Sequence, residues 1–369
     1  GERVFDPDKI VMFFDHYAPC ATITQAENHK QFREFCFSQG IEKLMDIDQG
    51  VCHQVLADKG WVHPGEIVVV TDSHTTTHGA FGAFGTGVGA TDLATIMITG
   101  KLWFMAPEIF RIHLVGKRAP GVYAKDIILH VIGRIGVDGA LYCAMEFAGS
   151  TIEHLSIEGR LTIANMAIEA GGKAGLFEVD DRCRAYVERR AEHALRAYHP
   201  DEDASYRQVI HIDAADVIPT VSWPHLPSNT HPVFESRHIA IDQAVIGSCT
   251  NGRIEDMRAA ADVLRGRTVD PSVRCIVIPA TQGVWLQCVH EGLMDVFIDA
   301  HCVVSTPTCG PCLGGYMGIL AAGERCVSST NRNFVGRMGD PTSEVYLASP
   351  AVAAASAVAG HIALPQDLS

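Results

Sequence analysis

Short apolar runs that end in polar residues alternate along this chain with segments whose apolar positions recur at helical spacing. The run KIVMFFDHYAP predicts a buried strand, and a helix from Gln25 to Gln39 follows it. After another helix near Gln54, EIVVVTDSHTTTHG predicts a second strand, which ends in a group of polar side chains. Alternating strands and helices of this kind predict an α/β fold.

The alternation continues through the middle of the chain. RIHLVG predicts a strand, a helix follows from Asp126 to Ile135, and ALYCAMEFAG is a further apolar run. A helix beginning near Ile152 or Thr162 would then carry Asn165 and Glu169. Residues four apart share a helix face, so these two side chains are able to enter one pocket, although such a pair by itself is typical of an exposed face.

A highly charged stretch, DDRCRAYVERRAEHALRAYHPDEDA, predicts a surface helix and a domain boundary. Beyond it DQAVIGSCTNG, CIVIPA and DAHCVVST alternate with helices such as the one from Ile254 to Leu264. From these shifts we expect three α/β domains, at residues 1–110, 111–207 and 208–369. The most apolar stretch, residues 347–364, contains a proline and a histidine and predicts a buried helix, not a membrane span.

Composition narrows the classes of function. A hydrophobic content of 47% with 20% charged residues in 369 residues is typical of a well-packed globular protein. The net charge of −14 argues against a sequence-independent grip on nucleic-acid phosphates. Twelve cysteines are too sparse for a disulfide scaffold and indicate reduced thiols. We find no signal peptide in the opening GERVFDPDKI, so we expect a cytoplasmic protein that binds neither membrane nor nucleic acid.

Three cysteines carry the most specific chemistry. Cys249 lies in IGSCTNGR, and Cys309 and Cys312 lie in STPTCGPCLGG, all in turn-rich segments that let the backbone fold closely around a bulky inorganic group. Cysteine thiolates hold iron-sulfur clusters, and these three would supply three of the usual four ligands. The fourth iron would then be open and able to act as a Lewis acid, which indicates catalysis more than electron transport.

Other functions remain open for these segments. Cys-Gly-Pro-Cys is also the redox dithiol of thioredoxin-like proteins, but there it opens a helix, and here Gly314 and Gly315 follow at once. A zinc site would need a fourth ligand, for which His301 or Cys302 is available. The glycine-rich GAFGAFGTGVG suggests dinucleotide binding, but it stands too far from the preceding strand, so close backbone packing explains it better.

Acid and imidazole groups gather at two predicted strand ends. Asp15 and His16 follow the first strand, and Asp72, Ser73, His74 and His78 follow the second. A carboxylate beside a histidine raises its pKa and fixes its tautomer, so such pairs are suited to proton transfer. A single pair is more often a solvated turn. Two pairs at two strand ends favour a functional site.

Six ordered motifs identify a family resemblance that covers nearly the whole chain. They are DH at 15–16, TDSHT at 71–75, NMAIE at 165–169, GSCTNGR, TCGPC and NRNFVGR. In this order they resemble the aconitase superfamily of iron-sulfur hydro-lyases, and more specifically the separate large subunits of isopropylmalate dehydratases. The resemblance implies three α/β domains around a 4Fe-4S cluster.

The resemblance also implies a role for each residue at the matching positions. Asp15 and His16 would protonate the departing hydroxyl, Glu169 would pair with an active-site histidine, and Asn331 would support the cluster. The other implied positions fall into ligands of the cluster, side chains near the iron-bound water and substrate, and side chains that bind the substrate. These are Cys249, Cys309 and Cys312; then Asp72, Ser73 and His74; then Asn165, Arg332 and Arg337.

The implied activity is the isomerisation of 2-isopropylmalate and 3-isopropylmalate in leucine biosynthesis by dehydration and rehydration. Homoaconitase and maleate or dimethylmalate hydratase are alternatives for such a large subunit, and an iron-responsive RNA-binding protein is an alternative of another class. In the family a fourth, swivelling domain brings a serine base, and an N-terminal stretch brings one more polar contact. We expect a small partner subunit to carry that domain, and the substrate to be a small di- or tricarboxylate hydroxy-acid.

Overall fold

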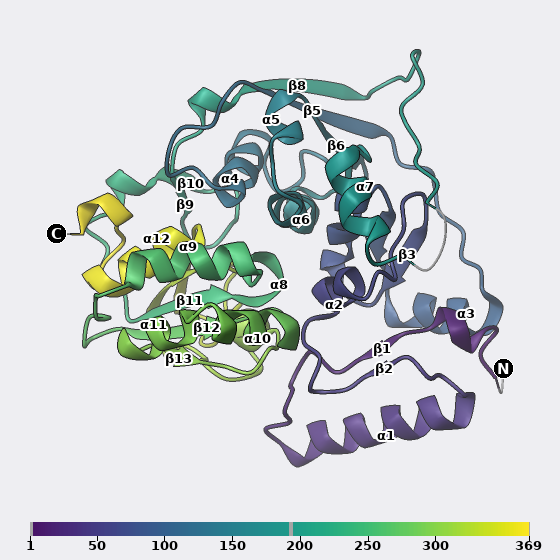
Figure 1. Cartoon of the computed structure of the whole chain (residues 1–369), viewed down its shortest axis with the longest axis horizontal. Coiled ribbons are helices and arrows are strands. Elements are labelled where there is room, and N and C mark those ends of the chain that lie inside the picture. Colours follow the sequence, from purple (N-terminus) through teal and green to yellow (C-terminus); the bar gives the residue numbers. More distant parts are fainter. Residues whose placement is uncertain (1–2, 192–194, 369) are drawn as a thin grey trace.

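Two sheets organise the chain in the computed structural model, which describes residues 3–191 and 195–368 (Figure 1). Within the described residues the larger sheet has seven strands in the order β10-β9-β15-β14-β11-β12-β13, and the smaller has four in the order β7-β6-β5-β8. All pairs in the smaller sheet are parallel, and only β9 and β10 introduce antiparallel pairs in the larger one. The predicted α/β fold is confirmed.

The strands and helices alternate nearly throughout. The strands are β1 (Met12–Phe13), β2 (Leu44–Met45), β3 (Ile67–Val70), β4 (Phe84–Gly87), β5 (Ile109–Val115), β6 (Ala144–Ala148), β7 (Ala174–Phe177), β8 (Gln208–Asp213), β9 (Thr220–Ser222), β10 (Thr230–Pro232), β11 (Gln243–Gly247), β12 (Arg274–Ile278), β13 (Val303–Val304), β14 (Arg325–Ser328) and β15 (Glu344–Leu347). The α-helices are α1 (Ile23–Gln39), α2 (Cys52–Asp58), α3 (Ala90–Thr99), α4 (Ala124–Ile135), α5 (Ser150–Glu153), α6 (Ile157–Asn165), α7 (Asp181–Glu188), α8 (Ser248–Asn251), α9 (Ile254–Leu264), α10 (Gln282–His290), α11 (Leu293–Asp299) and α12 (Pro350–Ala359).

Two apolar cores fill the molecule. One lies between the larger sheet and helices α9, α11 and α12, whose buried side chains it shares. The other surrounds α4 and α6 and continues onto the opposite face of the larger sheet through Val245, Ile276 and Leu347. The larger sheet is therefore covered on both faces, as is typical of buried parallel strands. Residues 3–191 and 195–368 contain no helix long and apolar enough to cross a membrane. The buried side chains of α12 belong to the first of these cores, so the predicted buried helix is confirmed.

Several predicted elements differ in extent from those observed. The first strand was predicted to be buried, but β1 has only two half-buried residues, because it pairs with β2 alone in a small peripheral sheet. The predicted helix through Asn165 and Glu169 is divided, since α6 ends at Asn165 and Glu169 lies in the 3-10 helix η3 (Met166–Ala170). The predicted surface helix in the charged stretch is confirmed as α7, and part of that stretch lies outside the described residues.

The glycine-rich segment forms β4, which pairs in parallel with β3. A Cβ atom on Gly85 would lie 2.2 Å from the carbonyl oxygen of Thr75, and one on Gly87 would lie 2.7 Å from that of Asp72. Thr75 lies in the 3-10 helix η2 (Ser73–Phe81), and Asp72 is the N-cap of that helix. The glycines therefore allow close backbone packing against the turn that carries Asp72 and His74, as expected from the sequence.

The sheet pairing bears on the predicted domain boundaries. β8 lies beyond residue 207, yet it pairs along its whole length with β5 of the smaller sheet. The three domains remain a prediction, and we place the second boundary after β8 instead of before it.

Candidate functional site

Cys249 lies at the end of β11, where the chain turns sharply into α8. Gly247 has φ of 124°, and a Cβ atom there would lie 1.9 Å from the carbonyl oxygen of Ile278, so only glycine fits this turn. Ser248 also has a positive φ, of 68°. This backbone places the buried Cys249 thiol at the carboxyl edge of the sheet, where α/β folds position their functional groups.

Arg253 holds this turn from behind. Its guanidinium group is buried and donates hydrogen bonds to the carbonyl oxygens of Cys249 (3.0 Å) and Thr250 (2.6 Å). Its Nε donates to Oε1 of Gln54 at 2.8 Å, which ties the turn to α2. The sequence analysis did not single out Arg253, although it stands in the same motif as Cys249.

Cys309 is the N-cap of the 3-10 helix η6 (Gly310–Leu313), and Cys312 lies within that helix. The amide of Cys309 donates to the carbonyl oxygen of Asp15 at 3.0 Å, and the hydroxyl of Thr308 donates to the same oxygen at 2.8 Å. Two adjacent groups of the cysteine-bearing segment are thus anchored on one atom of the first acid-imidazole pair.

Amide donors face the sulfur of Cys249. Nδ2 of Asn331 lies 3.3 Å from this sulfur, and Nδ2 of Asn165 lies 3.6 Å from it. Oδ1 of Asn331 accepts from the Cys312 thiol at 3.4 Å, so one side chain bridges two cysteines. The amide of Asn165 is otherwise engaged with Thr77 and Thr250. This geometry favours a role for Asn165 at the sulfur, whereas the sequence analysis expected it to bind substrate.

The three thiols influence one another's ionisation. Burial raises the pKa of Cys249 to about 12, and the hydrogen bond with Cys312, together with burial, raises the pKa of Cys309 well above its ordinary value. The Cys309 hydrogen bond lowers the pKa of Cys312 well below its ordinary range against the effect of burial, and Arg337, with Nη2 at 3.8 Å, adds to this.

The donor set fits an iron-sulfur cluster better than a single metal ion. No group of three or more His, Cys, Asp or Glu side chains in the described parts of the chain is arranged around one ion. The thiolate ligands of a cluster bind different irons, so their sulfurs do not need to meet at one point. Hydrogen bonds from amides and Arg337 to the sulfurs are the contacts that tune such clusters.

Asp15 and His16 form a close pair beside these cysteines. Oδ1 of Asp15 lies 2.8 Å from Nδ1 of His16, and Oδ2 accepts from the amide of Cys52 at 2.9 Å. Burial alone would lower the pKa of His16, but the charge and hydrogen bond of Asp15, with help from Asp72, raise it to about 9. Burial would raise the pKa of Asp15, yet His16 and Cys52 lower it to about 2. The pair is ionised across the neutral range.

Asp72 is surrounded by imidazoles. Its Oδ1 accepts from the amide of His74 at 2.7 Å and lies 3.4 Å from Nδ1 of the same residue. Nε2 of His53 lies 3.2 Å from Oδ1, and Nε2 of His16 lies 3.7 Å from Oδ2. Burial would raise the pKa of Asp72, but His53 and His74 lower it well below its ordinary range. The two predicted strand-end pairs are thus parts of one network.

The sequence analysis missed His53. It lies in α2, where every residue from Cys52 to Ala57 is buried, and its ring packs edge-on against the buried ring of His78 at 5.6 Å between centroids. The signal was two adjacent polar residues, His53 and Gln54, inside an otherwise apolar segment. His78 was grouped with the strand-end residues, but both of its ring nitrogens lack a hydrogen-bond partner in the described structure, and burial lowers its pKa well below the ordinary value.

A second chain of charges joins distant segments. Nε2 of His74 lies 2.8 Å from Oε1 of Glu169, and the same oxygen accepts from Nε of Arg332 at 2.7 Å. Burial would lower the pKa of His74, but hydrogen bonds to Asp72 and Glu169 raise it. The expected pairing of Glu169 with an active-site histidine is thus present as a contact.

An unused donor remains beside the cysteines. Nε of Arg337 is buried and has no hydrogen-bond partner in the described structure. Arg332 uses its Nε for Glu169. A buried donor without a partner is costly, so the guanidinium group of Arg337 is suited to receive an anionic ligand.

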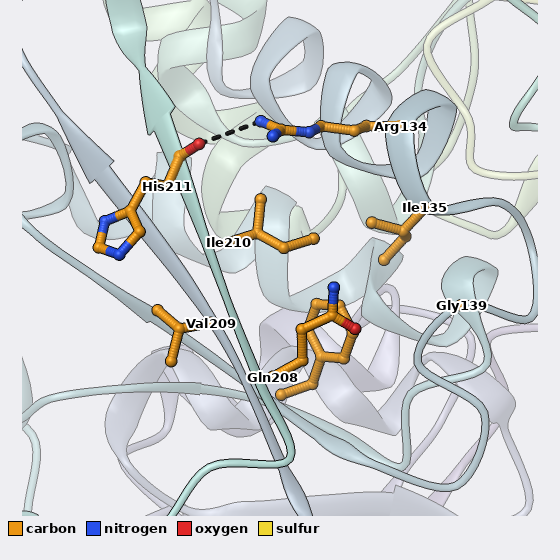
Figure 2. A pocket seen from close by; sticks show the side chains of 8 residues that line it. Arg134, Ile135, Gly139, Gln208, Val209, Ile210 and His211 are labelled. Carbon is orange, nitrogen blue, oxygen red and sulfur yellow. Dashed lines mark hydrogen bonds between the residues drawn. The ribbon is translucent and has the colours of Figure 1, made fainter.

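One hollow in the described structure lies away from these residues. It measures about 570 Å³ and is lined by residues of α4, β5 and the edge strand β8, including Arg134, Gln208 and His211 (Figure 2). Arg134 donates to the backbone carbonyl of His211 at 3.0 Å. None of the cysteines or paired carboxylates lines it, so this hollow lies apart from the site described above.

One known protein family matches nearly the whole chain. Residues 15–360 match the family described as Aconitase family (aconitate hydratase). The chain belongs to the aconitase family. Membership implies an iron-sulfur cluster and a hydro-lyase activity, and it confirms the resemblance seen in the six motifs.

Relatives are similar over the full length. A protein of Acetivibrio thermocellus is 57% identical over 99% of this chain and 88% of its own length. One of Syntrophus aciditrophicus is 57% identical over 100% and 88%, and one of Hydrogenobaculum sp. is 55% identical over 100% and 87%. Each of the three is named 3-isopropylmalate dehydratase large subunit.

A solved structure shows the same fold. The holo-form of aconitase X from Thermococcus kodakaraensis has a TM-score of 0.50 and 13% identity, covering 85% of this chain and 72% of its own. At this identity the similarity concerns the fold alone, and it agrees with the aconitase-like α/β architecture predicted from the sequence.

We predict that Asp15→Asn lowers the pKa of His16 from about 9 toward its ordinary 6.5. The substitution removes the carboxylate charge that offsets the burial of the imidazole. Histidine resonances followed by NMR across pH 5–10 measure the change, with the exposed Asp48→Asn as the matched control. An unchanged His16 titration in Asp15→Asn would contradict the assignment of the charge partner.

The Asp15–His16 pair also makes the free energy of unfolding depend on pH. Because the folded pKa of His16 lies above 6.5, its stabilisation is complete below pH 6.5 and is lost as pH rises through about 9. Because the folded pKa of Asp15 lies below 3.8, its stabilisation is complete above that pH and is lost as pH falls through about 2. Thermal unfolding of Asp15→Asn should show a weaker dependence between pH 6.5 and 9 than the parent chain does.

Proposed function

We propose that this chain is the large subunit of an iron-sulfur hydro-lyase that interconverts 2-isopropylmalate and 3-isopropylmalate by dehydration and rehydration. The observation that carries the proposal is the convergence of three cysteines with two acid-imidazole groups and two arginines in a chain whose full-length relatives carry that name. The reaction belongs to leucine biosynthesis. We place it in the cytoplasm, since all twelve cysteines are free thiols.

Cys249, Cys309 and Cys312 are proposed to hold a 4Fe-4S cluster, with Asn331 and Asn165 supporting the Cys249 sulfur. When bound, the cluster supplies a Lewis-acidic iron that polarises the hydroxyl and carboxylate of the substrate. Arg337 beside Cys312 offsets the negative charge that deprotonated cysteines bring into a buried site.

We assign to His16 the donation of a proton to the departing hydroxyl group. Its raised pKa keeps it protonated at neutral pH, and the Asp15 contact at Nδ1 leaves Nε2 as the nitrogen that faces the site and Asp72. Asp72 and His74 are proposed to contact the substrate, and Glu169 orients His74 through the 2.8 Å contact. His53 joins this group as a second imidazole on Asp72.

Arg332 and Arg337 are assigned to bind the carboxylates of the substrate. Nε of Arg337 is buried without a partner in the described structure, Arg332 contacts Glu169 of the same site, and a guanidinium group binds a carboxylate through two parallel hydrogen bonds. Ser73, the first residue of η2 after Asp72, is assigned to the same substrate. A small hydroxy-acid with two carboxylates matches this number of charges.

A small partner subunit is proposed to complete the site. The relatives are named as large subunits, and dehydration needs a base on the side of the substrate opposite the acid. Within the described residues the imidazoles around Asp72 all belong to one network on the acid side, so the base is assigned to the partner's swivelling domain.

We predict that the cluster-replete chain converts isopropylmalate only when its small subunit is present. Formation of the dehydrated intermediate, followed by its absorbance, measures the activity with and without the partner. Homocitrate, citraconate and maleate serve as competing substrates. A higher kcat/KM for any of these than for isopropylmalate would replace the proposed substrate, and substantial turnover by the chain alone would place the base within it.

We predict that Cys309→Ser abolishes the visible absorption of the reconstituted chain. A hydroxyl does not replace a thiolate in holding a cluster with only three protein ligands. Iron and sulfide content and the EPR signal after reconstitution measure the loss. The matched control is Cys288→Ser, at a buried thiol of α10, which should keep the chromophore. A normal cluster in Cys309→Ser would remove this residue from the ligand set.

We predict that Arg337→Lys lowers kcat/KM by an amount equivalent to about 2 kcal/mol, because lysine keeps the charge but loses the planar fork. Steady-state kinetics of the two-subunit enzyme measure it, with the exposed Arg182→Lys as the matched control. Kinetics equal to those of the parent enzyme would exclude two-point binding by Arg337.

A further inference from the structure

Lys125 is a lysine buried completely at the start of α4. Its ammonium group donates to the backbone carbonyl oxygen of Ser329 at 2.9 Å and to that of Thr330. Neither partner is charged, and Lys125 makes no ion pair with a carboxylate anywhere in the described structure. Lysine is almost never fully buried unless it is paired, so this position calls for a compensating charge.

The negative groups that act on Lys125 point to the site. In descending order they are Asp256, Cys249, Cys312 and Glu169. Two of these are cysteines of the proposed cluster site, and one pairs with His74. Burial lowers the pKa of Lys125 to about 7 in the chain as described, and deprotonated cysteines would favour its charged form.

The carbonyl partners of Lys125 occupy a decisive place in the chain. Ser329 and Thr330 follow the end of β14 and are fully buried, so their carbonyl oxygens need donors. The next two residues are Asn331, which contacts the sulfurs of Cys249 and Cys312, and Arg332, which contacts Glu169. Lys125 therefore grips the backbone that immediately precedes both side chains.

Asp126 extends the contact on the other side of the helix start. Its Oδ1 accepts from the amide of Thr220 in β9 at 2.8 Å, and Oδ2 accepts from the amide of Tyr123 at 2.7 Å. Lys125 and Asp126 thus bind two different segments. Lys125 binds carbonyl oxygens just after β14, and Asp126 binds an amide of β9. Figure 1 shows α4 lying between the two sheets, next to β9 and β10.

We propose that Lys125 is a positioning residue that fixes the Ser329–Thr330 backbone, so that Asn331 faces Cys249 and Cys312 and Arg332 faces Glu169, and that its positive charge offsets the charge of deprotonated cysteines. The proposal rests on the proposed function for the identity of the bound group. It predicts two separable effects of Lys125, one on geometry through hydrogen bonds and one on the charge balance of the site.

The test compares Lys125→Met, which removes both donors and charge, with Lys125→Gln, which keeps an amide donor without the charge. Lys117→Met is the matched control, since it makes the same substitution at an exposed lysine of the same region. The measurements are hydrogen exchange of residues 329–333 in the cluster-free chain, the midpoint potential of the reconstituted cluster by EPR, and kcat/KM with the small subunit.

In Lys125→Met we expect faster exchange at residues 329–333, a midpoint potential more negative than in Lys117→Met, and kcat/KM lower by roughly 10- to 100-fold. The potential should fall because a nearby positive charge favours the reduced cluster. Lys125→Gln should show the same decrease in midpoint potential, but slower hydrogen exchange at residues 329–333 than Lys125→Met. If Lys125→Met fails to fold, the potential of Lys125→Gln decides the question.

Potentials of both variants equal to that of Lys117→Met, with kcat/KM within about twofold, would overturn the proposal. A lower potential in a chain that does not convert isopropylmalate, even as wild type with its partner, would leave the role of Lys125 standing and refute the proposed substrate instead. The two conclusions are thus tested separately.

Discussion

Desolvation of charge is the constraint on which the site depends. Asp15 and Asp72 lie in places where burial would favour their neutral forms, and Glu169 is buried close by. Asp15 and Asp72 remain ionised because histidines stand within contact distance, and Glu169 receives both His74 and Arg332. Removing one partner from such a pair leaves an uncompensated buried charge, which is far more costly than the pair is stabilising. The histidines and carboxylates therefore require each other.

The same constraint explains how distant segments meet. Glu169 lies in η3, His74 in η2 and Arg332 beyond β14, so one carboxylate joins three parts of the chain. The apolar cores lie behind this polar junction on either side of the larger sheet. Apolar packing supplies most of the driving force for folding, while directional charge contacts fix the relative placement of the pieces at the edges of the sheets.

The sequence predicted those parts of the site that local chemistry determines. Strand exits carry Cys249 and Asp72. The sequence identified Asn165 and Glu169 as site candidates, but the predicted single helix is divided, and the two side chains contact different partners, Cys249 and His74. His53 and Lys125 were missed because their importance comes from partners far away in the chain, Asp72 and the Ser329 carbonyl. The sequence did not indicate that β8 belongs to the smaller sheet, because its pairing with β5 depends on tertiary contacts that no local pattern marks.

One carbonyl oxygen has a wider consequence. The main-chain oxygen of Asp15 receives both the Cys309 amide and the Thr308 hydroxyl, while the side chain of Asp15 holds His16. The sulfur-bearing turn and the proton donor therefore share one rigid anchor, and a displacement of either is carried to the other through a single peptide unit. Displacement of the turn that carries Cys309 would therefore also displace the backbone that positions Asp15 and His16.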